Sequence, residues 1–237
     1  MATNTNRING FSPSRYLNGA PWNGQANLYA IPVSDTTASY AIGDVVQSAG
    51  GSDADGVIYI KKAPSGFNAA GAALGVIVGI RVADPGVSLQ GVALGLETNY
   101  IIAGTRANVR YVYVADDPAL LFEVSAGLTA TNITLAKMRY NAGLGSFYNS
   151  ADQTYAIDQN ATATTLSQSS PSSNIIIPSS TVATTASLPL SIMGLVQRAD
   201  NPGTNIGAYS RLLVKFNFHE LGATAQVGAA ATNFLGL

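Results

Sequence analysis

The sequence contains no cysteine, a single histidine and few charged residues, which make up only 11% of the chain. The absence of cysteine excludes disulfides, thiolate nucleophiles and cysteine-bound metal ions. Charged residues usually form about a quarter of a soluble domain, so much of this surface must consist of Ser, Thr, Asn, Gln, Gly and Ala. A surface this poor in charge is expected to pack against a partner.

The sequence also lacks clustered positive charge and long apolar runs. The formal net charge is −1 and there is no extended run of Lys or Arg, so nucleic acid, which binds clustered cations, is not an expected partner. The longest apolar run, residues 69–80, has twelve residues, whereas a helix needs about 20 to span a bilayer. The polar N-terminus, Met1–Arg7, lacks the apolar region of a secretory signal. We therefore expect no membrane partner and no export by that route.

Catalytic and metal-binding patterns are likewise scarce. His219 stands beside Glu220 at the end of a predicted strand, without a Gly-x-Ser-x-Gly nucleophile motif. We interpret it as a residue that caps the strand or hydrogen-bonds at an interface. Asp53–Gly56 lacks the later ligands of a calcium loop and predicts a hairpin turn, and Asp116 and Asp117 predict another turn. We expect no enzymatic activity, no catalytic or metal-binding residues and no cofactor.

Strand patterns dominate what is present. Hydrophobic residues make up 47% of the chain, enough for a packed core. Segments rich in Val, Ile, Leu, Tyr or Phe and bounded by turn residues are typical of strands. These segments are residues 28–33, 57–61, 74–82, 100–103, 109–115, 120–124, 188–197 and 212–218. The sequence therefore predicts an all-β fold with a jelly-roll or β-sandwich core.

The two ends of the chain differ from its middle. Residues 1–24 predict an extended N-terminal arm, and residues 221–237 an extended, charge-free C-terminal tail, because neither shows the alternation of a buried strand. Both nevertheless contain large apolar or aromatic side chains, which are unfavourable in water. The ones we single out are Phe11, Tyr16, Trp22, Phe234 and Leu235.

The middle of the chain, residues 25–220, predicts one β-rich core domain. Residues 140–185 form either long loops or a small second lobe of it. Residues 75–86 and 193–203 are alike: each has an apolar strand, then Arg, then an Asp/Pro/Gly turn. Either any strand that leads into a turn has this appearance, or the two segments hold equivalent places in a pseudo-symmetric fold.

Several stretches resemble a known family. They are Gly10–Pro13, Leu17–Pro21, Asn23–Gly24, Asn27–Pro32, Arg110–Pro118, Phe122–Val124, Gly194–Arg198, Asp200–Asn201 and Phe216–His219. In these stretches the chain is similar to the cement, or head-decoration, proteins that many short-tailed phages encode beside the major capsid gene. The run Tyr-Val-Tyr-Val-Ala-Asp-Asp-Pro, residues 111–118, is the most distinctive of them. The resemblance does not extend to the residues after His219.

The resemblance implies a fold, a location and partners. A cement protein of this kind has a β-rich, jelly-roll-like core, has no enzymatic role, and sits on the outer surface of the capsid in the virion. Its partners are the major capsid protein and further copies of itself, as a dimer or trimer. We therefore expect Phe11, Tyr16, Trp22, Phe234 and Leu235 to contact the capsid or neighbouring subunits.

The alternative is a carbohydrate- or receptor-binding module of a phage fibre or tail. Exposed aromatic side chains can stack on sugars, and the 11 Tyr residues would suffice for such a site. Most of them lie inside strand patterns, however, where aromatic residues are expected as core or cross-strand partners.

Overall fold

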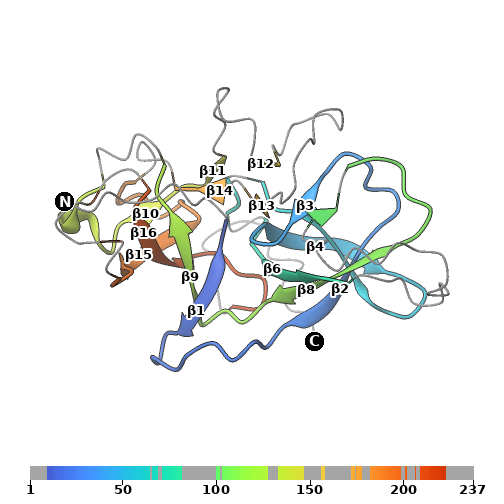
Figure 1. Ribbon diagram of the computed structural model, residues 1–237, viewed down its shortest axis with the longest axis horizontal. Helices are drawn as coiled ribbons and strands as arrows, with labels where there is room; N and C mark the ends of the chain where they lie inside the picture. Colours follow the sequence, from blue (N-terminus) through green and yellow to red (C-terminus); the bar gives the residue numbers. More distant parts are fainter. Residues whose placement is uncertain are drawn as a thin grey trace.

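The computed structural model describes residues 10–64, 66–68, 71–81, 100–101, 103–127, 133–146, 156–157, 172–173, 175–177, 182–198, 201, 206 and 209–222. Among these residues every regular element is a β-strand, except the short 3-10 helix η2 (Leu135–Lys137). The predicted all-β fold is thereby confirmed. The longer strands form two groups that lie side by side, a closed barrel and an open sheet (Figure 1).

The barrel contains five strands from the first half of the chain. They are β2 (Asn27–Ile31), β4 (Val45–Ser52), β5 (Ile58–Lys62), β6 (Gly75–Ile80) and β8 (Arg110–Ala115), closed in the order β2-β5-β4-β6-β8. Alternate residues face the interior, so that Val112 and Val114 of β8 are fully buried while Tyr113 between them is 41% exposed. The barrel is therefore filled by the apolar face that the alternation predicts.

The open sheet joins the start of the chain to its second half. Its strands are β1 (Ser12–Tyr16), β9 (Leu120–Ser125), β16 (Arg211–Phe216), β15 (Leu190–Leu195) and β10 (Asn141–Ala142), in the order β1-β9-β16-β15-β10. All four pairings are antiparallel. The barrel strands thus lie in sequence between β1 and β9, two neighbours in the sheet.

Short two-stranded pairs complete the described structure. They are β3 (Tyr40–Ala41) with β7 (Tyr100–Ile101), β11 (Gly145–Ser146) with β14 (Ile175–Ile176), and β12 (Ala156–Ile157) with β13 (Ser172–Ser173). Within the predicted loop or lobe at residues 140–185, the described part contains only such short strands. Asp53–Gly56 forms the predicted hairpin turn between β4 and β5, with Asp53 Oδ1 accepting from the backbone of Asp55 and Val57.

One apolar core joins the barrel to the sheet. It contains Val45 and Val76 from barrel strands together with Phe122 and Phe216 from the sheet. Phe11 is 1% exposed and belongs to the same cluster. Its ring centroid lies 6.1 Å from that of Phe122 and 5.6 Å from that of Phe216. Phe11 is therefore a core residue, which corrects its expected role as a contact for other subunits.

The described part of the predicted N-terminal arm is also integrated into the domain. Strand β1 pairs with β9, with Ser12 opposite Glu123 and Tyr16 opposite Leu120. The Phe11 backbone N–H donates to the Gly43 carbonyl oxygen, 3.0 Å away. Residues 12–16 thus form the edge strand of the sheet, and this part of the expected arm is paired with the β-rich domain. Residues 1–9 and 223–237 lie outside the described residues.

The two similar segments occupy different sheets. Strand β6 lies in the barrel between β4 and β8, and β15 lies in the open sheet between β16 and β10. Each has a register irregularity just before its glycine, between Ile77 and Gly79 in β6 and between Ile192 and Gly194 in β15. The irregularity precedes a glycine in both strands, but Gly79 lies two residues before Arg81 whereas Gly194 lies four residues before Arg198. Both interpretations of the repeat accommodate this difference.

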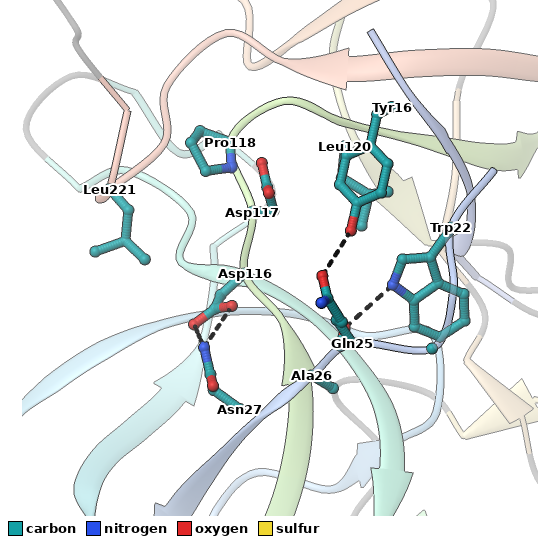
Figure 2. Close-up of a pocket in the computed structure, with 11 residues that line it drawn as sticks. Tyr16, Trp22, Gln25, Ala26, Asn27, Asp116, Asp117, Pro118, Leu120 and Leu221 are labelled. Carbon is teal, nitrogen blue, oxygen red and sulfur yellow. Dashed lines mark hydrogen bonds between the residues drawn. The ribbon is translucent and has the colours of Figure 1, made fainter. Parts of the chain in front are cut away.

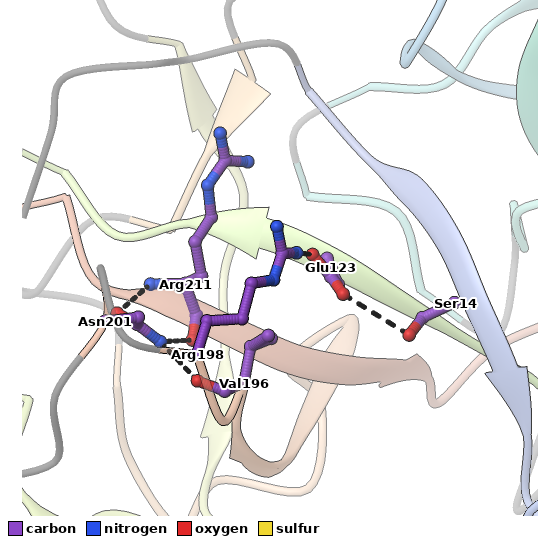
Figure 3. A network of polar contacts seen from close by, with 6 residues as sticks. All are labelled: Ser14, Glu123, Val196, Arg198, Asn201 and Arg211. Carbon is purple, nitrogen blue, oxygen red and sulfur yellow. Dashed lines mark hydrogen bonds and ion pairs between the residues drawn. The ribbon is translucent and has the colours of Figure 1, made fainter.

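A polar network fastens the turn after β15 to the sheet (Figure 3). Asn201 is 3% exposed, and its side chain pairs with the backbone as a strand would. Its Nδ2 donates to the carbonyl oxygens of Val196 (2.7 Å) and Arg211 (2.9 Å), and its Oδ1 accepts from the Arg211 N–H (2.9 Å). Arg198, from the same turn, forms an ion pair with Glu123 of β9. The buried side-chain amide of Asn201 thus makes hydrogen bonds to the backbone of Val196 and Arg211 like those that a neighbouring strand would make.

Candidate binding site

A pocket lies where the chain passes between sheet and barrel (Figure 2). Its volume is about 570 Å³. It lies along two crossings, from β1 to β2 and from β8 to β9. The lining residues are Tyr16, Trp22, Gly24, Gln25, Ala26, Asn27, Asp116, Asp117, Pro118, Leu120 and Leu221.

The first crossing is a segment without charge, residues 17–26, which we call the bridge segment. It begins with a tight turn in which the Tyr16 N–H donates to the Ala20 carbonyl (2.8 Å) and the Gly19 N–H to the Tyr16 carbonyl (2.9 Å). Gly19 has φ of 90°, a conformation that favours glycine. The Trp22 N–H then donates to the Ser14 carbonyl, 3.1 Å away. This turn sets Trp22 beside Tyr16 at the pocket.

Two aromatic side chains form one wall of the pocket. Trp22 Nε1 donates to the carbonyl oxygen of Gln25 (3.1 Å), and the Tyr16 hydroxyl donates to Gln25 Oε1 (3.4 Å). Both rings are partly buried and pack against the apolar core. Figure 2 shows the two side chains converging on Gln25 from the same side. The rings are therefore held from two directions, by core contacts and by hydrogen bonds.

A buried carboxylate occupies the opposite part of the pocket. Asp116 is 8% exposed, and Asn27 Nδ2 donates to both of its oxygens, at 3.0 and 2.9 Å. The Tyr29 hydroxyl also donates to Asp116 Oδ2, 2.6 Å away. Burial, together with this hydrogen bond, raises the pKa of Tyr29, so the hydroxyl keeps its proton and remains a donor. The orientation of Asp116 is thus determined by neutral donors.

The pocket is negatively charged. Asp116 and the exposed Asp117 both line it, and among the described residues no Lys or Arg does. The neighbouring His219 does not compensate, because burial lowers its pKa to about 4. Its Nδ1 accepts from the Leu221 N–H, 3.1 Å away, in the turn after β16. The His219 side chain therefore makes a hydrogen bond within the turn that follows the closing strand.

The expected contact residues are distributed over three environments. Tyr16 and Trp22 lie together at the pocket, Phe11 lies in the core, and Phe234 and Leu235 lie outside the described residues. The sequence did not indicate a role for Gln25 or Asn27, because nothing near them in the chain distinguishes them from other polar residues. The fold places Tyr16 of β1 beside Gln25, and Asp116, which follows β8, beside Asn27. Asp116 and Asp117 were recognised only as turn residues.

The described residues contain no group of three or more His, Cys, Asp or Glu side chains placed to hold a metal ion. In the same part of the chain no helix is both long and apolar enough to cross a membrane. No family model, no curated protein and no solved structure matches this chain.

Proposed function

We propose that the chain is a structural virion protein that binds the outer surface of a phage capsid and stabilises it through protein–protein contacts. The proposal rests on the resemblance to cement proteins of the discontinuous stretches named above, which lie between Gly10 and His219. The structural observation that supports it is the bridge segment, an exposed surface of the kind that proteins bury in interfaces. On this proposal the major capsid protein and further copies of the chain are the partners.

The bridge segment has the composition and exposure of an interface. It carries no charge, and all of its residues are exposed except Trp22 and Ala26, which are partly buried. Leu17 at its turn is 46% exposed. Leu221, which shares the pocket with Trp22, is 58% exposed. Interface centres are poor in charge and rich in aromatic and apolar side chains, so this surface is suited to a protein partner.

Attachment to a capsid does not require a large contact per copy. A small oligomer on a repeated lattice engages several contacts at once, and each linked contact raises the overall affinity without any new interaction. A surface of modest area with little charge can therefore hold the shell together when many copies bind.

Binding to purified capsids tests the proposal. Capsids of the encoding phage, prepared without this chain, are mixed with the wild-type protein and with Leu17→Glu, and binding is measured by co-sedimentation. Burying a leucine contributes about 1.5–3 kcal/mol, so the charged variant should bind at least about tenfold more weakly. Leu135→Glu is the matched control, because Leu135 is 61% exposed on η2 and does not line the pocket.

Two results would contradict the proposal. If the wild-type protein did not sediment with the capsids, the proposed function would be wrong. If it did so, but Leu17→Glu bound as tightly as Leu135→Glu, the attachment surface would lie elsewhere. Cryo-electron microscopy of virions then gives the position and copy number, and density only at the tail would favour a receptor-binding module instead.

A further inference from the structure

We propose that the pocket between the bridge segment and Asp116 binds an uncharged sugar unit of a glycan. The bridge segment is also the surface that the proposed function assigns to the capsid, so glycan binding would be a second use of the same surface and is tested on the chain without capsids. Its basis is the combination of an aromatic wall, fixed hydrogen-bonding groups and negative charge in one cavity.

The aromatic wall suits the apolar face of a sugar ring. Pyranose rings present C–H groups on their faces and hydroxyl groups around their edges, so they pack against aromatic rings while hydrogen-bonding sideways. Trp22 and Tyr16 line the cavity and are already immobilised by the core and by Gln25. A ligand would therefore find the rings in place and would lose little free energy in ordering them.

The polar groups are also oriented before any ligand arrives. A carboxylate has about four acceptor sites. The donors to Asp116 are the Asn27 amide, which contacts both oxygens, and the Tyr29 hydroxyl. An acceptor site therefore remains for a ligand hydroxyl. The exposed Asp117 offers further acceptors. The side-chain oxygen of Gln25 accepts from the Tyr16 hydroxyl, which leaves the amide nitrogen of Gln25 to donate to a ligand.

Charge selects among glycans. In the described part of the chain, the carboxylates of Asp116 and Asp117 line the cavity and no cationic side chain does. Uronic acids, sialic acids and phosphorylated sugars would bring a like charge into contact with Asp116 and be repelled. A neutral hexose or N-acetylhexosamine has no such penalty. The volume of about 570 Å³ lies within the range of about 300–1,000 Å³ usual for small-molecule sites.

A positively charged side chain of a protein partner is the competing occupant. It would neutralise the charge of the cavity but would leave unused the amide side chains of Gln25 and Asn27, which supply donors as well as acceptors. Mixed donors and acceptors around an aromatic wall match hydroxyl groups better, since each hydroxyl both donates and accepts.

The chain provides its own probe for the test, because Trp22 is its only tryptophan. Trp22 emission is recorded while the full chain, without capsids, is titrated with neutral oligosaccharides of glucose, galactose, mannose and N-acetylglucosamine in α and β linkages. A saturable change with at least one of them is expected, and oligogalacturonate, an acidic counterpart, should produce none.

Variants tie the signal to the pocket. Gln25→Ala changes an exposed side chain at the pocket and should weaken glycan binding about fivefold or more, the effect of a lost hydrogen bond. Asn23→Ala is the matched control, because Asn23 is exposed in the same segment but does not line the pocket. Circular dichroism of both variants verifies the fold.

Three outcomes would overturn the inference. They are no change in Trp22 emission with any neutral oligosaccharide, equal affinity of wild type and Gln25→Ala, or a response to an arginine-containing peptide without a response to glycans. The last would assign the pocket to a protein partner. None of these results depends on capsid binding, so the proposed function and this inference can fail separately.

Discussion

Gly75 of β6 lies against the backbone of β8 so closely that a Cβ atom on it would be 2.3 Å from the carbonyl oxygen of Ala115. It would also be 2.8 Å from Cγ1 of Val114. Carbonyl oxygens in a sheet cannot move without breaking strand pairing. Only glycine therefore allows β6 to pass β8 at this point, where the barrel meets the shared core.

Gly75→Ala should consequently reduce the free energy of unfolding by at least about 3 kcal/mol, the upper part of the range for overpacking. Urea denaturation followed by circular dichroism measures it. Gly194→Ala is the control, since a Cβ there has no atom within 4 Å, and its stability should stay within about 1 kcal/mol of wild type. Equal stability of the two variants would contradict the close approach of β6 and β8.

Phe11→Ala tests whether residues 10–16 belong to the core. Removing a fully buried phenylalanine should lower the free energy of unfolding by about 3–5 kcal/mol, because its contacts with Phe122 and Phe216 are lost. Leu17→Ala, at a site 46% exposed, should change it by less than about 0.5 kcal/mol. If Phe11→Ala were as stable as Leu17→Ala, Phe11 would not be a core residue in solution.

Asn201→Asp should destabilise the turn after β15. The substitution replaces the Nδ2 donor by an oxygen, which would face the carbonyl oxygens of Val196 and Arg211. A buried acceptor without a donor costs about 1–3 kcal/mol, and more if it is charged. Thermal unfolding should show a clear loss for this variant, whereas Asn23→Asp on the bridge segment should behave like wild type. An unchanged melting temperature would mean that the amide does not pair with the backbone.

His219 should make the protein less stable in mild acid. Its pKa is about 4 in the folded protein against a usual 6.5, because burial disfavours the charged ring. The unfolded chain therefore takes up a proton between these two values while the folded chain does not, so stability falls as the pH falls through this window. Between pH 7 and pH 4 the loss from this residue should be about 3 kcal/mol.

His219→Asn isolates this effect, since the asparagine oxygen can still accept from the Leu221 N–H. Urea midpoints of both proteins are compared at pH 7 and pH 4. Burial also raises the pKa of the adjacent Glu220. As the pH falls towards the usual pKa of a glutamate, the folded chain takes up this proton before the unfolded chain does, so Glu220 increases stability where His219 decreases it. The effect of His219 is therefore the difference between the two proteins. The same pH dependence in both would show that His219 is not responsible.

The sequence predicted the strands that have a strong apolar pattern and missed those that do not. All eight predicted segments contain a strand. Strand β4 was missed because its second half, Ser48–Ser52, has the composition of a loop, and the structure has a register irregularity there with Gly50 and Gly51 at positive φ. Strand β1 was missed because it contains Pro13, which an edge strand tolerates.

The candidate site was less predictable, because it depends on contacts between distant residues. Asn27 and Asp116 are 89 positions apart, and nothing in either local sequence indicates that they pair. Trp22 and Tyr16 were identified by their chemistry as unlikely to remain in water, and the pocket explains where they lie. The burial of Phe11 could not be predicted, since its partners come from β9 and β16.

The order of the strands has a consequence for the nascent chain. All five strands of the barrel lie between residues 27 and 115, whereas β1 precedes this region and its partner β9 follows it. Ribosomes add about 5–20 residues per second, so roughly a hundred residues separate the emergence of β1 from that of β9 by about 5–20 s. The barrel can close during that time. Strand β1 therefore leaves the ribosome before the barrel strands but can pair with β9 only after them, and chaperones have that interval in which to bind it.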